Sequence, residues 1–388
     1  MRRLGAFFIM STLLLSGCVP QFEKEEEIVQ DIDDNTQETA IVPKYNISDQ
    51  YYRTVIPFKP SESRGLVVYR MNNRLDIDEF ETGLMRLAQE QFPTEEFLYQ
   101  DGQYLDSETV TAWLSRKLTD EQLANQEDKG ANLGLNPPPV TEGTLKEQNE
   151  ASPIYLSHIL EQNYLVKDDE GKAELGGIVL GLAMNSIHYY SQEQGYPREY
   201  EIPDAEIEQQ GKEMADEMIR RIRNIEGLEN VPITVGLFKQ EGKSSVVPGN
   251  FFAKGQVKSK ANSVEKWTVV NEEYYLFPSS DAMANYRDDA TRMLNFKADI
   301  DEYFPNYTGV VGRGFYKDEQ LTELTIEIPM QFYGKAEVVG FTQYVTGLIM
   351  EHFQNYFSVK CYISSISGPE AIIIREAGKE EPFVHIYD

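Results

Sequence analysis

Apolar residues recur at helical spacing in several long stretches of the chain. The clearest is 203–227, where one face carries Ile207, Gly211, Met214, Met218, Ile222 and Ile225. Asp204 is expected to cap this helix, and Gly227 lies just past its end. The same spacing predicts further helices over 75–92, 106–118, 279–304 and 337–357.

Shorter segments alternate apolar and polar residues or are apolar throughout, which predicts strands. These segments are 64–71, 176–190, 231–238, 308–316, 321–333, 359–366, 371–377 and 382–387. A long irregular loop is expected over 125–153, where three consecutive prolines interrupt regular structure. Because helices and strand pairs follow one another irregularly, we expect an α+β fold with mixed or antiparallel sheets. We predict two such domains, over 51–250 and 251–388.

The apolar run closest to the N-terminus resembles an export signal and not an element of the folded core. Arg2 and Arg3 precede an apolar segment from Leu4 to Leu15, which is typical of a secretory signal. Twelve helical residues rise roughly 18 Å, whereas the hydrocarbon core of a bilayer needs about 30 Å. We therefore predict that residues 1–17 are a signal peptide that is removed.

The residues at the expected cut resemble the bacterial lipobox, and they are Leu15, Ser16, Gly17 and Cys18. This resemblance implies that prolipoprotein-processing enzymes attach a diacylglyceryl group to the Cys18 thiol and cleave just before it. The alternative is an ordinary secretory cut followed by a chance cysteine. Acyl chains hold a protein on a bilayer for long periods, so the lipid bilayer is an expected partner. The expected location is the outer face of the cell membrane.

Composition adds a strong negative charge. Lys and Arg number 36 and Asp and Glu number 64, so the formal net charge is 36 − 64 = −28. Such a chain repels nucleic acid, which we exclude as a partner. Acidic residues dominate 18–50, which we predict to be a disordered, lipidated tether. The chain has two cysteines, so acylation of Cys18 leaves no intramolecular disulfide.

The sequence carries no recognisable signature of catalysis or of cofactor binding. Gly236–Ser245 resembles a phosphate-binding loop, but five residues instead of four separate its glycines. The sequence contains neither a G-x-S-x-G nor an H-E-x-x-H motif, and no two of its four histidines lie within four residues of each other. Cys361 lies among alternating apolar residues and is expected to be a core residue. We therefore expect no enzymatic activity, no cofactor and no metal.

A basic segment at 239–266 stands out from the acidic remainder. It carries six lysines against two glutamates, a local charge of 6 − 2 = +4. One interpretation is a ligand-contact loop for an anionic wall polymer or a protein partner. The alternative is an exposed connector whose aromatic residues anchor it to the core. The candidate contact residues are Lys243, Phe251, Phe252, Lys254, Lys258 and Lys260.

Several segments together resemble the CamS sex-pheromone lipoproteins of Gram-positive bacteria. They are the lipobox, the acidic tether, 231–240, 245–255 and the C-terminal α+β portion. The resemblance implies that a heptapeptide cut from the signal sequence acts as a pheromone that elicits conjugation. The matching stretch is Ala6, Phe7, Phe8, Ile9, Met10, Ser11 and Thr12.

The resemblance implies no chemistry for the folded body. We expect it to be a binding or structural module. Two alternatives remain open at this point. One is a cell-surface hydrolase that uses carboxylates, and the other is the ligand-binding lipoprotein of a transporter.

Overall fold

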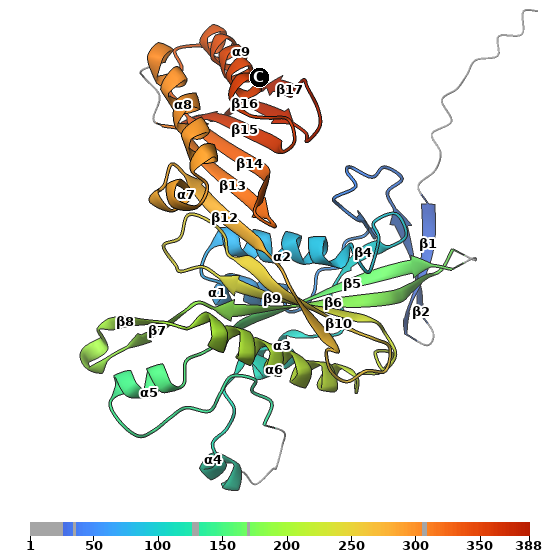
Figure 1. Ribbon diagram of the computed structural model, residues 1–388. Helices are drawn as coiled ribbons and strands as arrows, with labels where there is room; N and C mark the ends of the chain where they lie inside the picture. The colour runs from blue at the N-terminus through green and yellow to red at the C-terminus, as the bar shows by residue number, and fades with distance from the viewer. Residues whose placement is uncertain (1–25, 34–35, 126–131, 169–170, 305–308) are drawn as a thin grey trace, which may run out of the picture.

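The computed structural model describes residues 26–33, 36–125, 132–168, 171–304 and 309–388. Two sheets organise these residues, one following the other along the chain (Figure 1). Helices pack against both sheets, which confirms the α+β prediction.

The first sheet is seven-stranded, with the order β11-β10-β9-β6-β5-β4-β3. The pairs β6–β9 and β3–β4 are parallel, and the other pairs are antiparallel. Its strands are β3 (Arg53–Thr54), β4 (Leu98–Asp101), β5 (Leu156–Lys167), β6 (Ala173–Asn185), β9 (Ile233–Gln240), β10 (Asn250–Val257) and β11 (Lys266–Val269).

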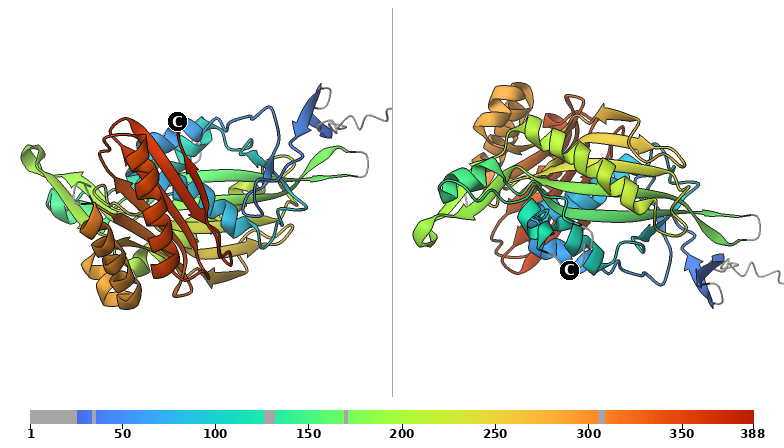
Figure 2. Two further views of the ribbon diagram at one scale, coloured as in Figure 1. Left: turned by 90° about the horizontal axis from the view of Figure 1, so that it is seen from above. Right: turned by 90° about the horizontal axis from the view of Figure 1, so that it is seen from below.

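Two long helices cover opposite faces of the first sheet (Figures 1 and 2). On one face, Phe80 and Leu84 of α2 (Arg74–Ala88) pack with Phe238. On the other, Met214 and Met218 of α6 (Asp204–Ile222) share a core with the sheet. Burial on both faces explains why β6 and β9 read as nearly continuous apolar runs.

Small residues let α2 approach the sheet closely. A Cβ atom on Gly181 of β6 would lie 2.7 Å from the ring of Phe80. A Cβ atom on Gly236 of β9 would lie 3.0 Å from the Leu87 side chain of α2. The glycines on these strands are therefore needed for helix packing.

The second sheet is six-stranded, with the order β12-β13-β14-β15-β16-β17. Only β14 and β15 pair in parallel, and α9 (Lys335–His352) connects them. Helices α7 (Ser280–Asn285) and α8 (Arg287–Tyr303) complete the core around Phe296, Phe341 and Ile326. The strands are β12 (Glu272–Phe277), β13 (Val311–Lys317), β14 (Gln320–Pro329), β15 (Ser358–Ser365), β16 (Gly368–Arg375) and β17 (Phe383–Ile386).

Smaller elements project from these layers. The β7–β8 hairpin and the β1–β2 hairpin lie at opposite ends of the molecule in all three views (Figures 1 and 2). The remaining elements are β1 (Glu26–Asp33), β2 (Thr36–Val42), β7 (Ile187–Ser191), β8 (Pro197–Glu201), α3 (Ser107–Leu114), α4 (Asp120–Ala124), α5 (Leu145–Ala151) and the 3-10 helices η1 (Arg64–Leu66) and η2 (Glu193–Gly195).

The expected coil over residues 18–50 is wrong for two segments. Residues 26–33 and 36–42 pair as the antiparallel strands β1 and β2. Ile28 and Val42 are buried against Val55, Leu98 and Leu165 of the first sheet. A few well-placed apolar side chains thus suffice to dock an otherwise acidic segment.

The strand predicted over 64–71 is wrong as well. The segment forms η1 and α1 (Val67–Arg70), and the amide of Met71 donates to the carbonyl of Val67. Short apolar runs do not separate a strand from a helix by periodicity alone.

The change of sheet also falls later in the chain than the predicted boundary at 250. Asn250 pairs with Lys239, so β10 forms a hairpin with β9 and β11 continues the same sheet. The two sheets are connected by Val270 and Asn271.

Candidate functional site

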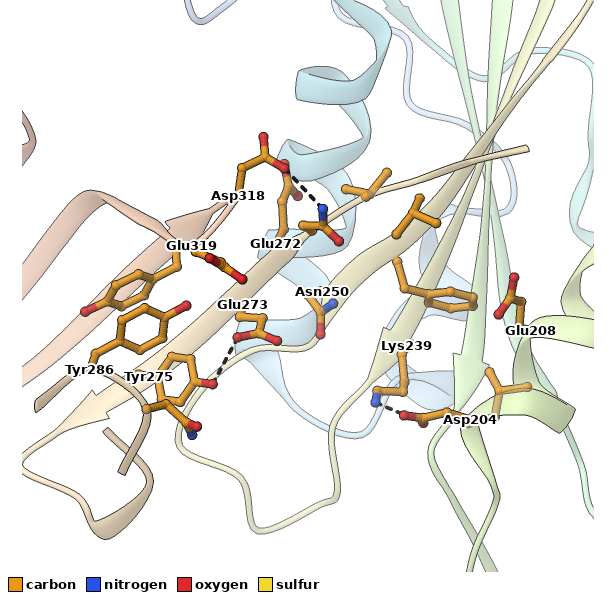
Figure 3. A pocket seen from close by; sticks show the side chains of 17 residues that line it. Asp204, Glu208, Lys239, Asn250, Glu272, Glu273, Tyr275, Tyr286, Asp318 and Glu319 are labelled. Carbon is orange, nitrogen blue, oxygen red and sulfur yellow. Dashed lines mark hydrogen bonds and ion pairs between the residues drawn. The ribbon is translucent and has the colours of Figure 1, made fainter. Parts of the chain in front are cut away.

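A cleft of about 1080 Å³ opens between the two sheets (Figure 3). The start of α6 and the adjoining ends of β9 and β10 form its first wall. Strand β12, the α7–α8 junction and the β13–β14 turn form its second wall. Figure 3 labels the lining residues Asp204, Glu208, Lys239, Asn250, Glu272, Glu273, Tyr275, Tyr286, Asp318 and Glu319.

The lining is strongly acidic. Six of its residues are carboxylates, and both walls contribute to them. Lys239 is the one cation among the lining residues, and its Nζ lies 3.0 Å from Oδ1 of Asp204. The cleft therefore has a surplus of negative charge that attracts cations and repels anions.

Tyrosine rings form a platform on the second wall. The rings of Tyr286 and Tyr316 stack with centroids 3.7 Å apart, and Tyr275 meets Tyr286 edge-on at 4.9 Å. The Tyr275 hydroxyl donates to Oε2 of Glu273 at 2.9 Å. Aromatic faces beside carboxylates are suited to hold ammonium or guanidinium groups.

The turn between β13 and β14 carries two of the carboxylates in an unusual backbone conformation. Asp318 and Glu319 have φ values of 51° and 64°, in the left-handed region that favours glycine. The amide of Asp318 donates to the carbonyl of Asn271 at 2.9 Å, which ties the turn to the connection between the sheets. Two acidic residues of the cleft lining therefore occupy backbone positions at which glycine would be easier to accommodate.

A buried ionic network includes Glu272, which lines the cleft. The Arg86 guanidinium of α2 donates to both oxygens of Glu272, at 3.0 and 2.6 Å, and to Glu79 at 2.6 Å. Burial raises the pKa of Glu79, and the opposing effect of Arg86 is smaller. Arg86 also lies over the ring of Phe315, with 4.6 Å to its centroid. The network joins the first sheet's helix to the second sheet.

A second buried carboxylate fixes the loop that connects β9 to β10. Asp76 accepts hydrogen bonds from the amides of Gly249 at 2.6 Å and Glu241 at 3.2 Å. Gly249 is required there, because a Cβ atom would lie 2.1 Å from the carbonyl oxygen of Lys239. Asp76 thereby holds the strand ends that bring Lys239 and Asn250 to the cleft.

The comparisons with known proteins cover most of the chain. Residues 58–381 match the family model described as CamS sex pheromone cAM373 precursor. The chain belongs to the CamS family. The description of this family is that of a pheromone precursor. A comparison with curated proteins gave no match.

Two solved structures of sex pheromone precursors resemble the CamS chain closely. The first is the C-terminal domain of the staph-cAM373 precursor from Staphylococcus aureus, at 33% identity and a TM-score of 0.72. The alignment covers 82% of this chain and 99% of that one. The second is from Lactobacillus salivarius, at 29% identity and a TM-score of 0.80, covering 90% and 99% of the two chains. Neither supports the hydrolase or the transporter alternative.

The residues of the predicted ligand-contact loop do not lie together in the structure of this CamS protein. Phe251 is fully buried in the α2 core, so it cannot contact a ligand, whereas Phe252 lines the cleft. Lys254 pairs with Glu90, and Lys258 pairs with Glu265 at 2.6 Å.

The other two lysines also lie apart from the cleft. Lys243 lies over the ring of Tyr189, with 4.1 Å to its centroid. Lys260 is exposed in the turn between β10 and β11. Of the six predicted contact residues, only Phe252 is among those that line the cleft.

The other predicted residues fall into two groups. The heptapeptide, the lipobox and Cys18 lie outside the described residues. Cys361 is fully buried, as predicted, and burial raises the pKa of its thiol well above the ordinary value. Within the described part of the chain, no cluster of three or more metal-binding side chains was found. No described helix is both long and apolar enough to span a bilayer.

Sequence reasoning missed the cleft, because its residues come from elements far apart in the chain. The acidic sequence contains so many carboxylates that nothing in it distinguishes Glu272 and Glu273 as residues of a cleft. The one local signal is the Asp318–Glu319 pair at a tight turn between two alternating segments.

Proposed function

We propose that this CamS protein is made as a lipoprotein precursor with two products. Processing before Cys18 yields a folded body that a diacylglyceryl group holds on the outer face of the membrane. The released signal peptide is the source of the heptapeptide Ala6–Thr12. The observation that carries this proposal is membership of a pheromone-precursor family together with the Leu15–Cys18 lipobox.

Metabolic labelling with a palmitate analogue tests the anchor. The wild-type protein should incorporate the label, and the Cys18→Ala variant should not. Mass spectrometry of the spent medium should find Ala6–Thr12 in wild-type cultures. Equal labelling of both proteins would refute the lipid anchor, and absence of the peptide would refute its release.

For the body, the cleft supports a binding function. Its acidic lining and tyrosine platform favour a partner with basic side chains over an anionic wall polymer. A Lys- or Arg-rich segment of a protein would place its cations against Glu273 and Glu319 and its stems against Tyr275 and Tyr286.

Binding of a fluorescent oligolysine peptide tests this cleft function. We expect the double variant Glu273→Gln/Glu319→Gln to bind it at least about tenfold more weakly, the effect of roughly 1.4 kcal/mol. The matched control is Glu193→Gln/Glu199→Gln, which removes the same charge from exposed positions on the β7–β8 hairpin. Equal weakening in both pairs would show that only the net charge of the protein attracts the peptide.

A further inference from the structure

The loop between β2 and β3 presents apolar side chains to solvent. Three large hydrophobic side chains of this loop are exposed, namely Tyr45, Ile47 and Tyr51, and Ile56 and Phe58 are exposed just after β3. Tyr45 and Ile47 are the most exposed of these five, with 89% and 91% of their surface exposed. Concentration of exposed apolar side chains in one segment is typical of a contact surface.

The loop is held in place at its base. Ile41 and Ile56 exchange backbone hydrogen bonds of 2.8 and 2.9 Å, which closes residues 42–55 into a loop. Its far side is attached to the segment after α2, because Gln89 Nε2 donates to the carbonyl of Gln50 at 2.8 Å. The Tyr52 hydroxyl donates to the carbonyl of Phe92 at 2.6 Å. The base and the far side of the loop that carries Tyr45 and Ile47 are therefore fixed to the first sheet and to the segment after α2.

The position of this loop along the chain limits where it can lie relative to the lipid anchor. Seven residues separate Cys18 from Glu26, where β1 begins. Eight residue steps of chain reach roughly 28 Å at most when fully extended. A compact chain of this length has a radius of gyration of about 21 Å, so the opposite end of the molecule lies beyond that reach. The β1–β2 end must therefore stay close to the membrane.

We infer that the 42–55 loop rests on the outer surface of the lipid bilayer, with Tyr45 and Ile47 at the headgroup boundary. This inference rests on the Cys18 anchor proposed above. The bridge between Ile41 and Ile56 places the loop directly beside the β1–β2 hairpin. Tyrosine rings and aliphatic side chains are both stabilised at that boundary, where one end is apolar and the other is hydrated.

Site-specific fluorescence quenching tests the inference on the intact, acylated protein. A bimane label is attached at Tyr45→Cys in one variant and at Tyr196→Cys in the other. Tyr196 is also exposed, but it lies in the β7–β8 hairpin at the opposite end of the molecule. The native Cys361 is fully buried and should not react. Both proteins are incorporated into phosphatidylcholine vesicles with brominated acyl chains, whose zwitterionic headgroups do not repel an acidic protein.

The expected result is loss of most of the bimane emission at position 45 and little loss at position 196. Equal quenching at both positions, or none at position 45 on vesicle-bound acylated protein, overturns the inference and leaves the anchor intact. If the bimane emission at position 45 shifts to the blue without quenching by lipid, and the molecular mass is doubled, the inference is also overturned. The loop then contacts a second copy of the chain and not the bilayer. Protein that carries no acyl group by mass spectrometry overturns the anchor and the inference together.

Discussion

Arg86 is the residue on which the relation between the two sheets most depends. Its guanidinium forms ion pairs with two carboxylates, Glu79 of α2 beside the first sheet and Glu272 of β12 in the second sheet. The Tyr274 hydroxyl also donates to Glu79, at 2.6 Å, so the polar groups of this network satisfy one another. Removing one member of such a buried network costs more than its net contribution, because the remaining charges are left unpaired.

We expect Arg86→Met to lower the free energy of unfolding by about 3–5 kcal/mol, because it leaves Glu79 and Glu272 as adjacent buried acids. Guanidinium denaturation measures the loss. Arg74→Met is the control on the same helix, where the pair with Asp78 is exposed and contributes at most about 0.5 kcal/mol. Equal losses in both variants would show that the network does not stabilise the fold.

At the scale of elements, amphipathic periodicity predicted the long helices well. Helices α2, α6 and α9 were expected within a few residues of their observed bounds, since each buries one continuous face. The β1–β2 hairpin was missed, because Ile28, Ala40 and Val42 are few apolar residues in an acidic background. The cleft was missed because no local pattern records which strand ends meet in space.

The docking of the β1–β2 hairpin leads to a specific prediction. Ile28→Ala should weaken its attachment by about 2–4 kcal/mol, the cost of a large-to-small change at a buried site. Hydrogen exchange of the amides in 36–42 should then accelerate roughly 30- to 1000-fold, while exchange in β6 stays unchanged. Ile47→Ala removes the same atoms from an exposed site and should leave both rates unchanged. Fast hydrogen exchange of the 36–42 amides in the wild-type protein would contradict the docked hairpin and would favour the disordered tether predicted from the sequence.

At the scale of the whole molecule, two buried histidines make stability depend on pH. Burial lowers the pKa of His158 to about 4, and the charge of Arg70 adds to this effect. Burial also lowers the pKa of His188 to about 4. Both side chains take up protons more readily in the unfolded chain, so stability is lost as pH falls from about 6.5 to about 4. Asp76 acts in the opposite direction, because burial raises its pKa to about 7.

Comparison of variants separates these effects. Lowering the pH from 7 to 5 should reduce the free energy of unfolding of His158→Leu by about 2 kcal/mol less than that of the wild type. The contributions of Asp76 and His188 are the same in both proteins and cancel in this comparison. Thermal denaturation at the two pH values gives the measurement. His385→Gln, at an exposed position, should behave as the wild type does. An unchanged loss in His158→Leu would show that this histidine does not couple folding to pH.

The two-residue connection at Val270 and Asn271 has a consequence for any attempt to divide the protein. Each half would expose one side of the Arg86 network: the first would keep Arg86 paired with Glu79, and the second would carry Glu272 without its counter-charge. Association of two separate halves would depend on their concentration. In the intact polypeptide the connection makes this association intramolecular, so each half is present near the other at a high effective concentration. Severing the chain at this point should therefore yield fragments that dissolve poorly alone and recover a common fold only when they are refolded together.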